Sequence, residues 1–223
     1  MNIVEYPDAE FMAMGLADVI AAQLSAVLRL AERALLVVPG GSTPGPVFDT
    51  LCGARLDWGR VDVLPSDERW RPQAHIRSNA GLIAQRLLCE RAAEARLIPL
   101  YLEEASPEEA APRLAESVAP HLPIDVALVG MGGDMHTASI FPRMPGIEAA
   151  LAHDAPTLLP VRIEGEPEPR ITLAAHVLRS AMHLHVVITG DDKRAALERA
   201  RGLDAAEAPI AALLDDATVH WAP

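Results

Sequence analysis

Short apolar runs recur along this chain, and each is followed by a loop of glycine, proline and polar residues. The clearest runs are 34–38, 61–64, 124–129 and 183–189. A strand that is apolar at consecutive positions, rather than at alternate ones, is typical of a parallel sheet with both faces covered. The runs therefore restrict the chain to folds in which a central sheet is buried between layers of helix.

Segments with helical spacing of apolar residues lie between these runs. Asp8 is placed to cap a helix that extends to about Arg33. Further helices are expected at 46–51, 78–89, 107–118 and 191–203, and further strands at 3–6, 96–100, 157–163 and 219–221, the last as an edge strand. Strands that alternate with helices predict an α/β fold: one Rossmann-like domain over residues 1–223, with a mainly parallel twisted sheet and helices on both faces.

The charge balance restricts the kinds of partner. The chain has 19 basic and 31 acidic residues, a net charge of −12, which argues against nucleic acid as a ligand. The same charge repels anionic metabolites, so any phosphate site must be locally basic. All the basic residues except Lys193 are arginines, which makes this lysine conspicuous.

Cysteine use and the N-terminal residues predict the compartment. Cys52 and Cys89 have neither metal-binding nor redox spacing, so we expect reduced thiols. The first residues lack the basic and apolar regions of a signal peptide, and no apolar stretch is expected to reach membrane-spanning length. These features predict a cytoplasmic protein without a membrane partner, and they predict nothing about its oligomeric state.

The loop 130–142 holds the strongest catalytic signal. It follows a predicted strand and carries Asp134 and His136 after three glycines, and open α/β sheets bind ligands at the carboxyl ends of their strands. A neutral imidazole is a natural general base near pH 7, and Asp134 and Asp67 are both candidates to orient it. The alternative is a helix-capping aspartate beside a structural histidine. The loop lacks the third glycine of a dinucleotide fingerprint, so no nucleotide cofactor is expected.

Three other features suit an anion. In the loop 39–46, Gly41 permits close approach of the backbone, Ser42 and Thr43 supply hydroxyl donors, and a helix N-terminus follows. Arg69 follows a predicted strand, and Lys193 lies near the start of a predicted helix, where an ammonium suits a phosphate. The alternatives are an ordinary turn, a solvated cluster of charges and a solvated lysine.

The remaining histidines suggest no chemistry. His183 and His185 share one face of a predicted strand, as a pair of metal ligands would, but no third ligand has recognisable spacing. We interpret both as structural and expect no metal.

Together these motifs resemble the 6-phosphogluconolactonase family. The resemblance covers nearly the whole chain, and the matching motifs are Gly40-Gly-Ser-Thr-Pro44, Asp67-Glu-Arg-Trp70, Ser78-Asn79, Gly130-Met-Gly-Gly-Asp134, His136-Thr-Ala-Ser139, Phe141-Pro142, Arg170-Ile-Thr172, Thr189-Gly190 and Lys193. The resemblance implies hydrolysis of 6-phospho-D-glucono-1,5-lactone to 6-phosphogluconate in the pentose phosphate pathway, without a cofactor.

Residue roles follow from the same resemblance. It implies that His136 is the catalytic histidine, with Asp67 and Asp134 as the carboxylates near it. It also implies that the sugar phosphate is bound by Gly41, Ser42, Thr43, Arg69 and Lys193, and it matches Arg170 to a motif arginine of the substrate site.

The chain departs from the family pattern at several positions. Met135 stands where the family usually has glycine, and a positive φ there would strain the loop and shift His136. Arg71 and Arg77 add positive charge near the expected phosphate. These departures keep open a catalytically silent sugar-phosphate-binding protein. A related glucosamine-6-phosphate deaminase is disfavoured, because Phe141 occupies the position of that family's ring-opening glutamate.

Overall fold

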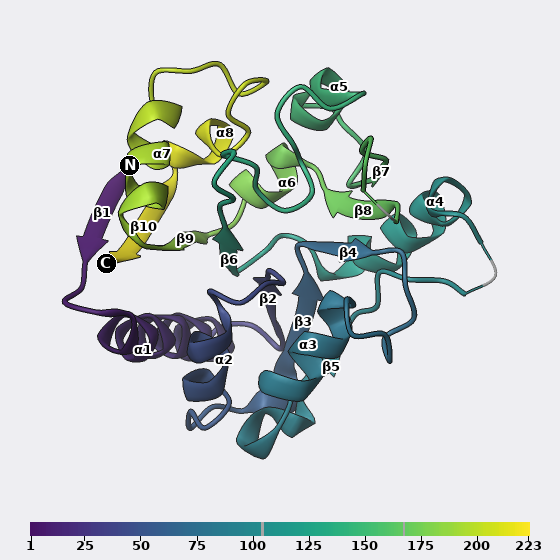
Figure 1. The fold of residues 1–223 in the computed structure, drawn as a ribbon. Coiled ribbons are helices and arrows are strands. Elements are labelled where there is room, and N and C mark those ends of the chain that lie inside the picture. Colours follow the sequence, from purple (N-terminus) through teal and green to yellow (C-terminus); the bar gives the residue numbers. More distant parts are fainter. Residues whose placement is uncertain (104, 167) are drawn as a thin grey trace.

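A wholly parallel seven-stranded sheet forms the centre of the computed structural model, which describes residues 1–103, 105–166 and 168–223. The strands follow the order β1 (Asn2–Glu5), β10 (Ala217–Ala222), β9 (His183–Thr189), β6 (Val126–Gly130), β2 (Ala34–Val38), β3 (Val61–Pro65) and β5 (Arg96–Leu97) (Figure 1). Every neighbouring pair is parallel. The predicted α/β class is confirmed.

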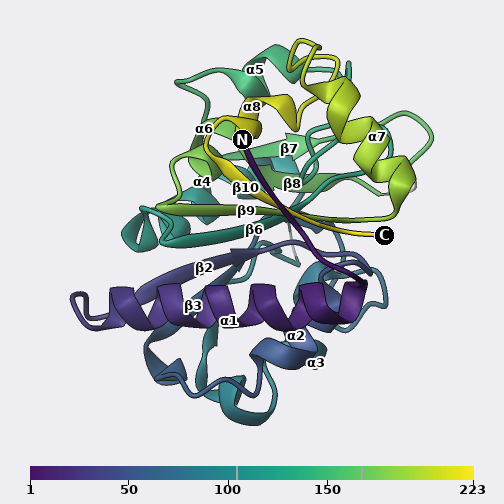
Figure 2. The ribbon, with the colours of Figure 1, turned by 90° about the vertical axis from the view of Figure 1, so that its left-hand side faces the viewer.

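Helices cover both faces of this sheet (Figure 2). One layer contains α1 (Ala9–Leu28), α2 (Gly45–Leu51) and α3 (Asn79–Arg86), and the other contains α4 (Pro107–Val118), α6 (Ala175–Arg179), α7 (Asp191–Ala200) and α8 (Ala211–Leu214). The short helix α5 (Ile147–Leu151) packs against α6. In β2, Leu36 and Val38 pack into the first layer, while Leu35 and Val37 pack into the second. Because both faces are buried, every position of the strand needs an apolar side chain.

A second, antiparallel sheet was not predicted. It contains β4 (Asp67–Arg69), β8 (Arg170–Leu173) and β7 (Leu158–Val161), in that order. We expected residues 65–72 to form a loop, and this was wrong for β4. A three-residue strand of charged side chains has no alternation to detect, and its partner lies about a hundred residues away in the chain.

The predicted position of the last strand in the sheet was wrong. Residues 219–221 were expected at a sheet edge, but β10 lies between β1 and β9. The edge is β1, which pairs with β10 along its whole length, from Asn2 opposite Thr218 to Glu5 opposite Trp221. The strand predicted at 96–100 is also shorter than expected, because β5 contains only Arg96 and Leu97.

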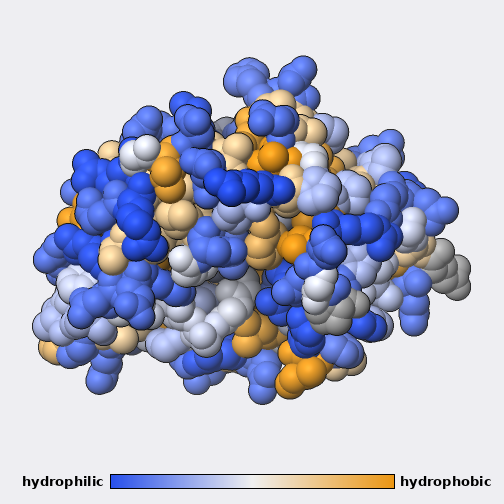
Figure 3. All heavy atoms as spheres, turned by 45° about the horizontal axis from the view of Figure 1, so that its top comes forward, coloured by the Kyte–Doolittle hydropathy of each residue, from blue (hydrophilic) through white to orange (hydrophobic). Residues whose placement is uncertain are grey.

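Helix α1 corrects the expectation about long apolar stretches. Its 20 residues include an 18-residue window with a mean hydropathy of 1.8, so by length and composition it is apolar enough to cross a membrane. Within the fold it is a core helix, because Met12, Leu16, Ile20 and Leu24 are at most 1% exposed against the sheet. Elsewhere the surface in Figure 3 is mainly hydrophilic, with apolar side chains in small separate patches.

Residues at both ends of α1 define its length. The Asp8 side chain accepts a hydrogen bond from the backbone N–H of Phe11 at 2.9 Å, as predicted for an N-cap. At the other end the Arg60 guanidinium donates to the carbonyls of Leu28 and Ala31 at 2.9 and 2.6 Å. These bonds satisfy carbonyls that a longer helix would use, and α1 ends at Leu28 rather than near residue 33.

A chain of polar side chains joins α1 to the sheet. The Tyr6 hydroxyl lies 2.9 Å from Nδ1 of His220, Nε2 of His220 lies 3.0 Å from Nδ1 of His185, and Nε2 of His185 lies 2.8 Å from Oε1 of Gln23. Since Gln23 Oε1 can only accept, each neutral imidazole donates through Nε2 and accepts at Nδ1. His185 is thus a structural residue, and no cluster of metal ligands occurs among the residues described.

This chain of hydrogen bonds makes the fold sensitive to acid. Burial lowers the pKa of His185 and of His220 to about 4, from 6.5 in an exposed histidine. Both groups therefore contribute stability above pH 6.5, and this contribution is lost as the pH falls towards 4. We expect the free energy of unfolding in urea to fall by about 2 kcal/mol per histidine between pH 7 and pH 5.

The matched control replaces both histidines by glutamine, which forms hydrogen bonds but does not titrate. The pH dependence in this window should then largely disappear. The carboxylate of Asp62 does not interfere. Its ion pairs with Arg33 and Arg96 lower its pKa in the folded state, and an unfolded aspartate has a pKa of about 4, so its contribution changes only below this window. An unchanged slope in the double variant would contradict this prediction.

Candidate active site

A cavity of about 240 Å³ opens at the carboxyl ends of the central strands. From β2 the chain proceeds outward to β3 and β5, and it then returns to place β6 on the other side of β2. Such a switch point leaves a crevice between the two neighbouring strand ends, where open α/β sheets bind their ligands. Here the crevice lies between the loop after β2 and the loop after β6, and both loops line the cavity.

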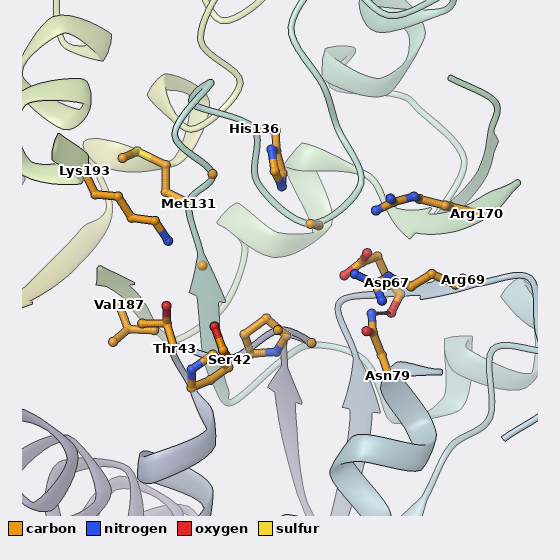
Figure 4. A pocket seen from close by; sticks show the side chains of 17 residues that line it. Ser42, Thr43, Asp67, Arg69, Asn79, Met131, His136, Arg170, Val187 and Lys193 are labelled. Atoms are coloured by element: carbon orange, nitrogen blue, oxygen red, sulfur yellow. Dashed lines mark hydrogen bonds between the residues drawn. The ribbon is translucent and has the colours of Figure 1, made fainter. Parts of the chain in front are cut away.

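One side of the cavity carries hydroxyls and an ammonium. Ser42 and Thr43, between β2 and α2, point into it, and Lys193 reaches it from the first turn of α7 (Figure 4). Gly41 has a φ of 93°, a conformation that favours glycine and lets the loop turn sharply. Burial lowers the pKa of the Lys193 ammonium, so this side favours a ligand whose negative charge offsets the loss of hydration.

Two arginines face each other on the other side of the cavity. Arg69 of β4 lies directly opposite Arg170 of β8 in the antiparallel pair, and both line the cavity (Figure 4). Their Nε atoms are buried and have no hydrogen-bond partner among the residues described. Arg170 donates to the Glu166 carboxylate at 2.7 Å. Like charges on opposite strands destabilise a sheet, and an anion in the cavity would relieve this repulsion.

The acidic residues of β4 connect the loops around the cavity. Asp67 accepts hydrogen bonds from the hydroxyls of Ser66 at 2.8 Å and Ser139 at 2.6 Å. Burial raises the pKa of Glu68, whose carboxylate accepts backbone N–H groups of Asn79 and Ala80, each at 2.7 Å. Asp67 thus holds the loop after β6, and Glu68 holds the N-terminus of α3, so β4 sets the spacing between them.

His136 projects into the cavity with one ring nitrogen engaged (Figure 4). Its Nδ1 lies 2.5 Å from Oδ1 of Asp134, and this hydrogen bond lowers the pKa of the Asp134 carboxyl. Of the two carboxylates considered for orienting His136, Asp134 makes the bond. A carboxylate that accepts Nδ1–H leaves Nε2 unprotonated, which is the tautomer that a general base needs.

The turn that carries His136 is tight. Met135 has a φ of 71°, so the residue that stands in place of the family's glycine is in the left-handed region. The backbone N–H of Gly132 donates to the carbonyl of His136 at 2.9 Å and closes the turn. A Cβ on Gly132 would overlap the His136 ring and the Asp134 carboxylate. Despite the strain at Met135, the Asp134–His136 pair is intact.

The structure brings the nine predicted site residues together. Eight line the cavity: Gly41, Ser42, Thr43, Asp67, Arg69, His136, Arg170 and Lys193. The ninth is Asp134, which bonds to His136. Two contacts were not predicted from the sequence, namely the Glu166 carboxylate on Arg170 and the stacking of the Phe141 ring on His136. Glu166 belongs to a segment that we expected to be an acidic loop, and nothing in its composition indicates an arginine partner.

Known proteins resemble this chain over almost its whole length. Residues 7–221 match the family model described as glucosamine-6-phosphate isomerases/6-phosphogluconolactonase. The 6-phosphogluconolactonase of Rhizobium meliloti is 41% identical, with 100% of this chain and 98% of the relative covered. That of Pseudomonas aeruginosa is 41% identical, with 95% and 90% covered. The crystal structure of a 6-phosphogluconolactonase from Shewanella baltica has a TM-score of 0.96 at 30% identity and covers 100% of this chain and 98% of its own.

The positive φ at Met135 gives a prediction about stability. Met135→Ala and Met135→Gly both remove the side chain, but only glycine relieves the left-handed strain. At ordinary helix or strand positions glycine is the less stable of the two by roughly 0.5–1 kcal/mol. Here we expect Met135→Gly to be more stable than Met135→Ala by about 1 kcal/mol in urea unfolding. A more stable alanine variant would show that residue 135 adopts a negative φ in solution.

Proposed function

The chain belongs to the 6-phosphogluconolactonase family and has that activity, and we propose that His136 is its general base in the hydrolysis of 6-phospho-D-glucono-1,5-lactone. The observation that carries the proposal is the hydrogen bond that Nδ1–H of His136 donates to the Asp134 carboxylate, at a cavity lined by cations. The lactonase activity assigns the protein to the pentose phosphate pathway. The intact Asp134–His136 pair weighs against a catalytically silent binding protein.

The lining of the cavity supports binding of a sugar phosphate. Three cations, Arg69, Arg170 and Lys193, face it, against one lining carboxylate, Asp67. The cavity is thus locally basic in a chain of net charge −12, as a phosphate site requires. In Figure 4 the cations approach from both sides of His136, so a substrate anchored through its phosphate would present its ring to the imidazole.

The proposed reaction needs no covalent intermediate. Nε2 of His136 takes a proton from a water molecule as the water oxygen forms a bond to C1 of the lactone. The tetrahedral intermediate then expels the ring oxygen, the C1–O bond breaks, and the imidazolium returns its proton to that oxygen. The product carboxylic acid ionises in water. The Asp134 carboxylate stabilises the transient imidazolium, and general base catalysis of this kind contributes roughly 10²–10⁴-fold.

Replacing the base tests this proposal. We expect His136→Ala to lower kcat by about 10²–10⁴-fold, measured as decay of freshly generated lactone against the uncatalysed rate. Affinity for 6-phosphogluconate should change little by calorimetry, because the cations remain. Full turnover by the folded His136→Ala variant would exclude the mechanism.

Two neighbouring glycines form a matched pair for the same loop. A Cβ at Gly132 would overlap the His136 ring, whereas a Cβ at Gly133 meets no atom within 4 Å. We therefore expect Gly132→Ala to lower kcat by at least about tenfold through misplacement of the imidazole, and Gly133→Ala to stay near the wild type. Equal effects of the two substitutions would show that general loop rigidity, rather than the ring position, limits the rate.

A further inference from the structure

A turn brings an aromatic ring onto the catalytic histidine. The backbone groups of Thr137 and Ile140 pair with each other, at 3.3 Å for Thr137 N–H and 2.9 Å for Ile140 N–H. The chain reverses between them, with Ala138 at a φ of 48°. Phe141 therefore returns to His136, and the two rings stack with centroids 4.4 Å apart at an interplanar angle of 27°.

The turn itself is anchored on both sides. The Thr137 hydroxyl donates to the carbonyl of Gly130, the last residue of β6, at 3.0 Å. The Ser139 hydroxyl donates to Asp67 of β4 at 2.6 Å. Both anchoring side chains are fully buried. The position of the Phe141 ring is thus set by the two strands that border the cavity.

The Phe141 ring has a second charged neighbour. The guanidinium carbon of Arg170 lies over it, 5.1 Å from the centroid. Arg170 itself is held independently of the ring, by its place in β8 and by its bond to Glu166. Loss of the ring should therefore disturb His136 more than it disturbs Arg170.

We propose that Phe141 is the positioning residue for His136, acting through the stacked ring rather than through contact with the reacting atoms. This inference rests on the proposed role of His136 as the base. The Asp134 bond fixes one ring nitrogen, and the stack fixes the plane in which the other nitrogen points. An aromatic face also stabilises a neighbouring cation. Because the imidazole becomes charged only during the reaction, the stack lowers the barrier more than it strengthens substrate binding.

Substitution of Phe141 separates this role from simple packing. We expect Phe141→Leu to lower kcat about 10- to 100-fold with KM changed less than about threefold, and Phe141→Tyr to restore kcat because it keeps the ring. Ile147→Ala removes apolar surface from the same small cluster on α5, outside the stack, and should retain wild-type kcat.

The pH profile supplies a readout that packing alone would not move. The charged groups around His136 are Asp134 at its Nδ1, Arg170 beyond the Phe141 ring, and Asp67, Arg69 and Lys193 across the cavity. All remain in Phe141→Leu, while the aromatic face that favours the imidazolium is lost. The acid limb of kcat/KM should therefore move to lower pH in Phe141→Leu and return in Phe141→Tyr.

The kinetics of the Phe141→Leu and Phe141→Tyr variants either support or overturn the positioning role of Phe141. A folded Phe141→Leu variant with wild-type kcat would overturn it, as would equal losses in the leucine and tyrosine variants with an unmoved acid limb. A nuclear magnetic resonance titration of the His136 ring protons detects the effect of the Phe141 ring on His136 without relying on catalysis. If His136→Ala proves fully active while that titration still moves in Phe141→Leu, the proposed base is wrong and the stacking contact stands.

Discussion

Burial of the central sheet on both faces is the constraint on which the rest of the structure depends. Because helices cover both sides, ligands can reach the strands only at their ends. The pairing of β2 with both β3 and β6 then determines which ends meet. The segments that follow these strands carry Ser42, Asp67 and His136, so the topology of the sheet assembles the cavity from parts that are distant in the chain.

The antiparallel sheet differs from the central sheet in that it concentrates positive charge. Its register places Arg69 opposite Arg170, an arrangement that is unfavourable for the sheet alone. The Glu166 carboxylate offsets part of this repulsion, since it accepts a hydrogen bond from Arg170. We expected Arg71 and Arg77 to add positive charge near the phosphate. Instead, both form ion pairs with the buried Glu168 carboxylate. A protein of net charge −12 thereby maintains a basic site, and it does so at some expense of stability.

Backbone strain in the loop after β6 lowers the stability of the fold further. Met135, Ala138 and Arg143 all have positive φ within nine residues, without being glycine. Strained backbone of this kind persists only where surrounding contacts over-determine it, and here the contacts are the hydroxyls of Thr137 and Ser139 and the carboxylate of Asp134. The same contacts hold His136 between Gly132 and Phe141, so the backbone strain and the position of the imidazole have one origin.

Local sequence determined the elements whose signals are local. Short, mainly apolar runs identified β2, β3, β6 and β9, the Asp8 cap identified the start of α1, and loop composition identified the candidate site residues. Tertiary structure alone decided the rest. The strand β4 is too short and too charged to predict, β10 lies inside the sheet only because β1 pairs with it, and the partner of His136 was settled between Asp134 and Asp67 by the path of one turn. These features depend on contacts between residues far apart in the chain or on a positive φ at a non-glycine residue, and neither leaves a periodic pattern in the amino-acid sequence.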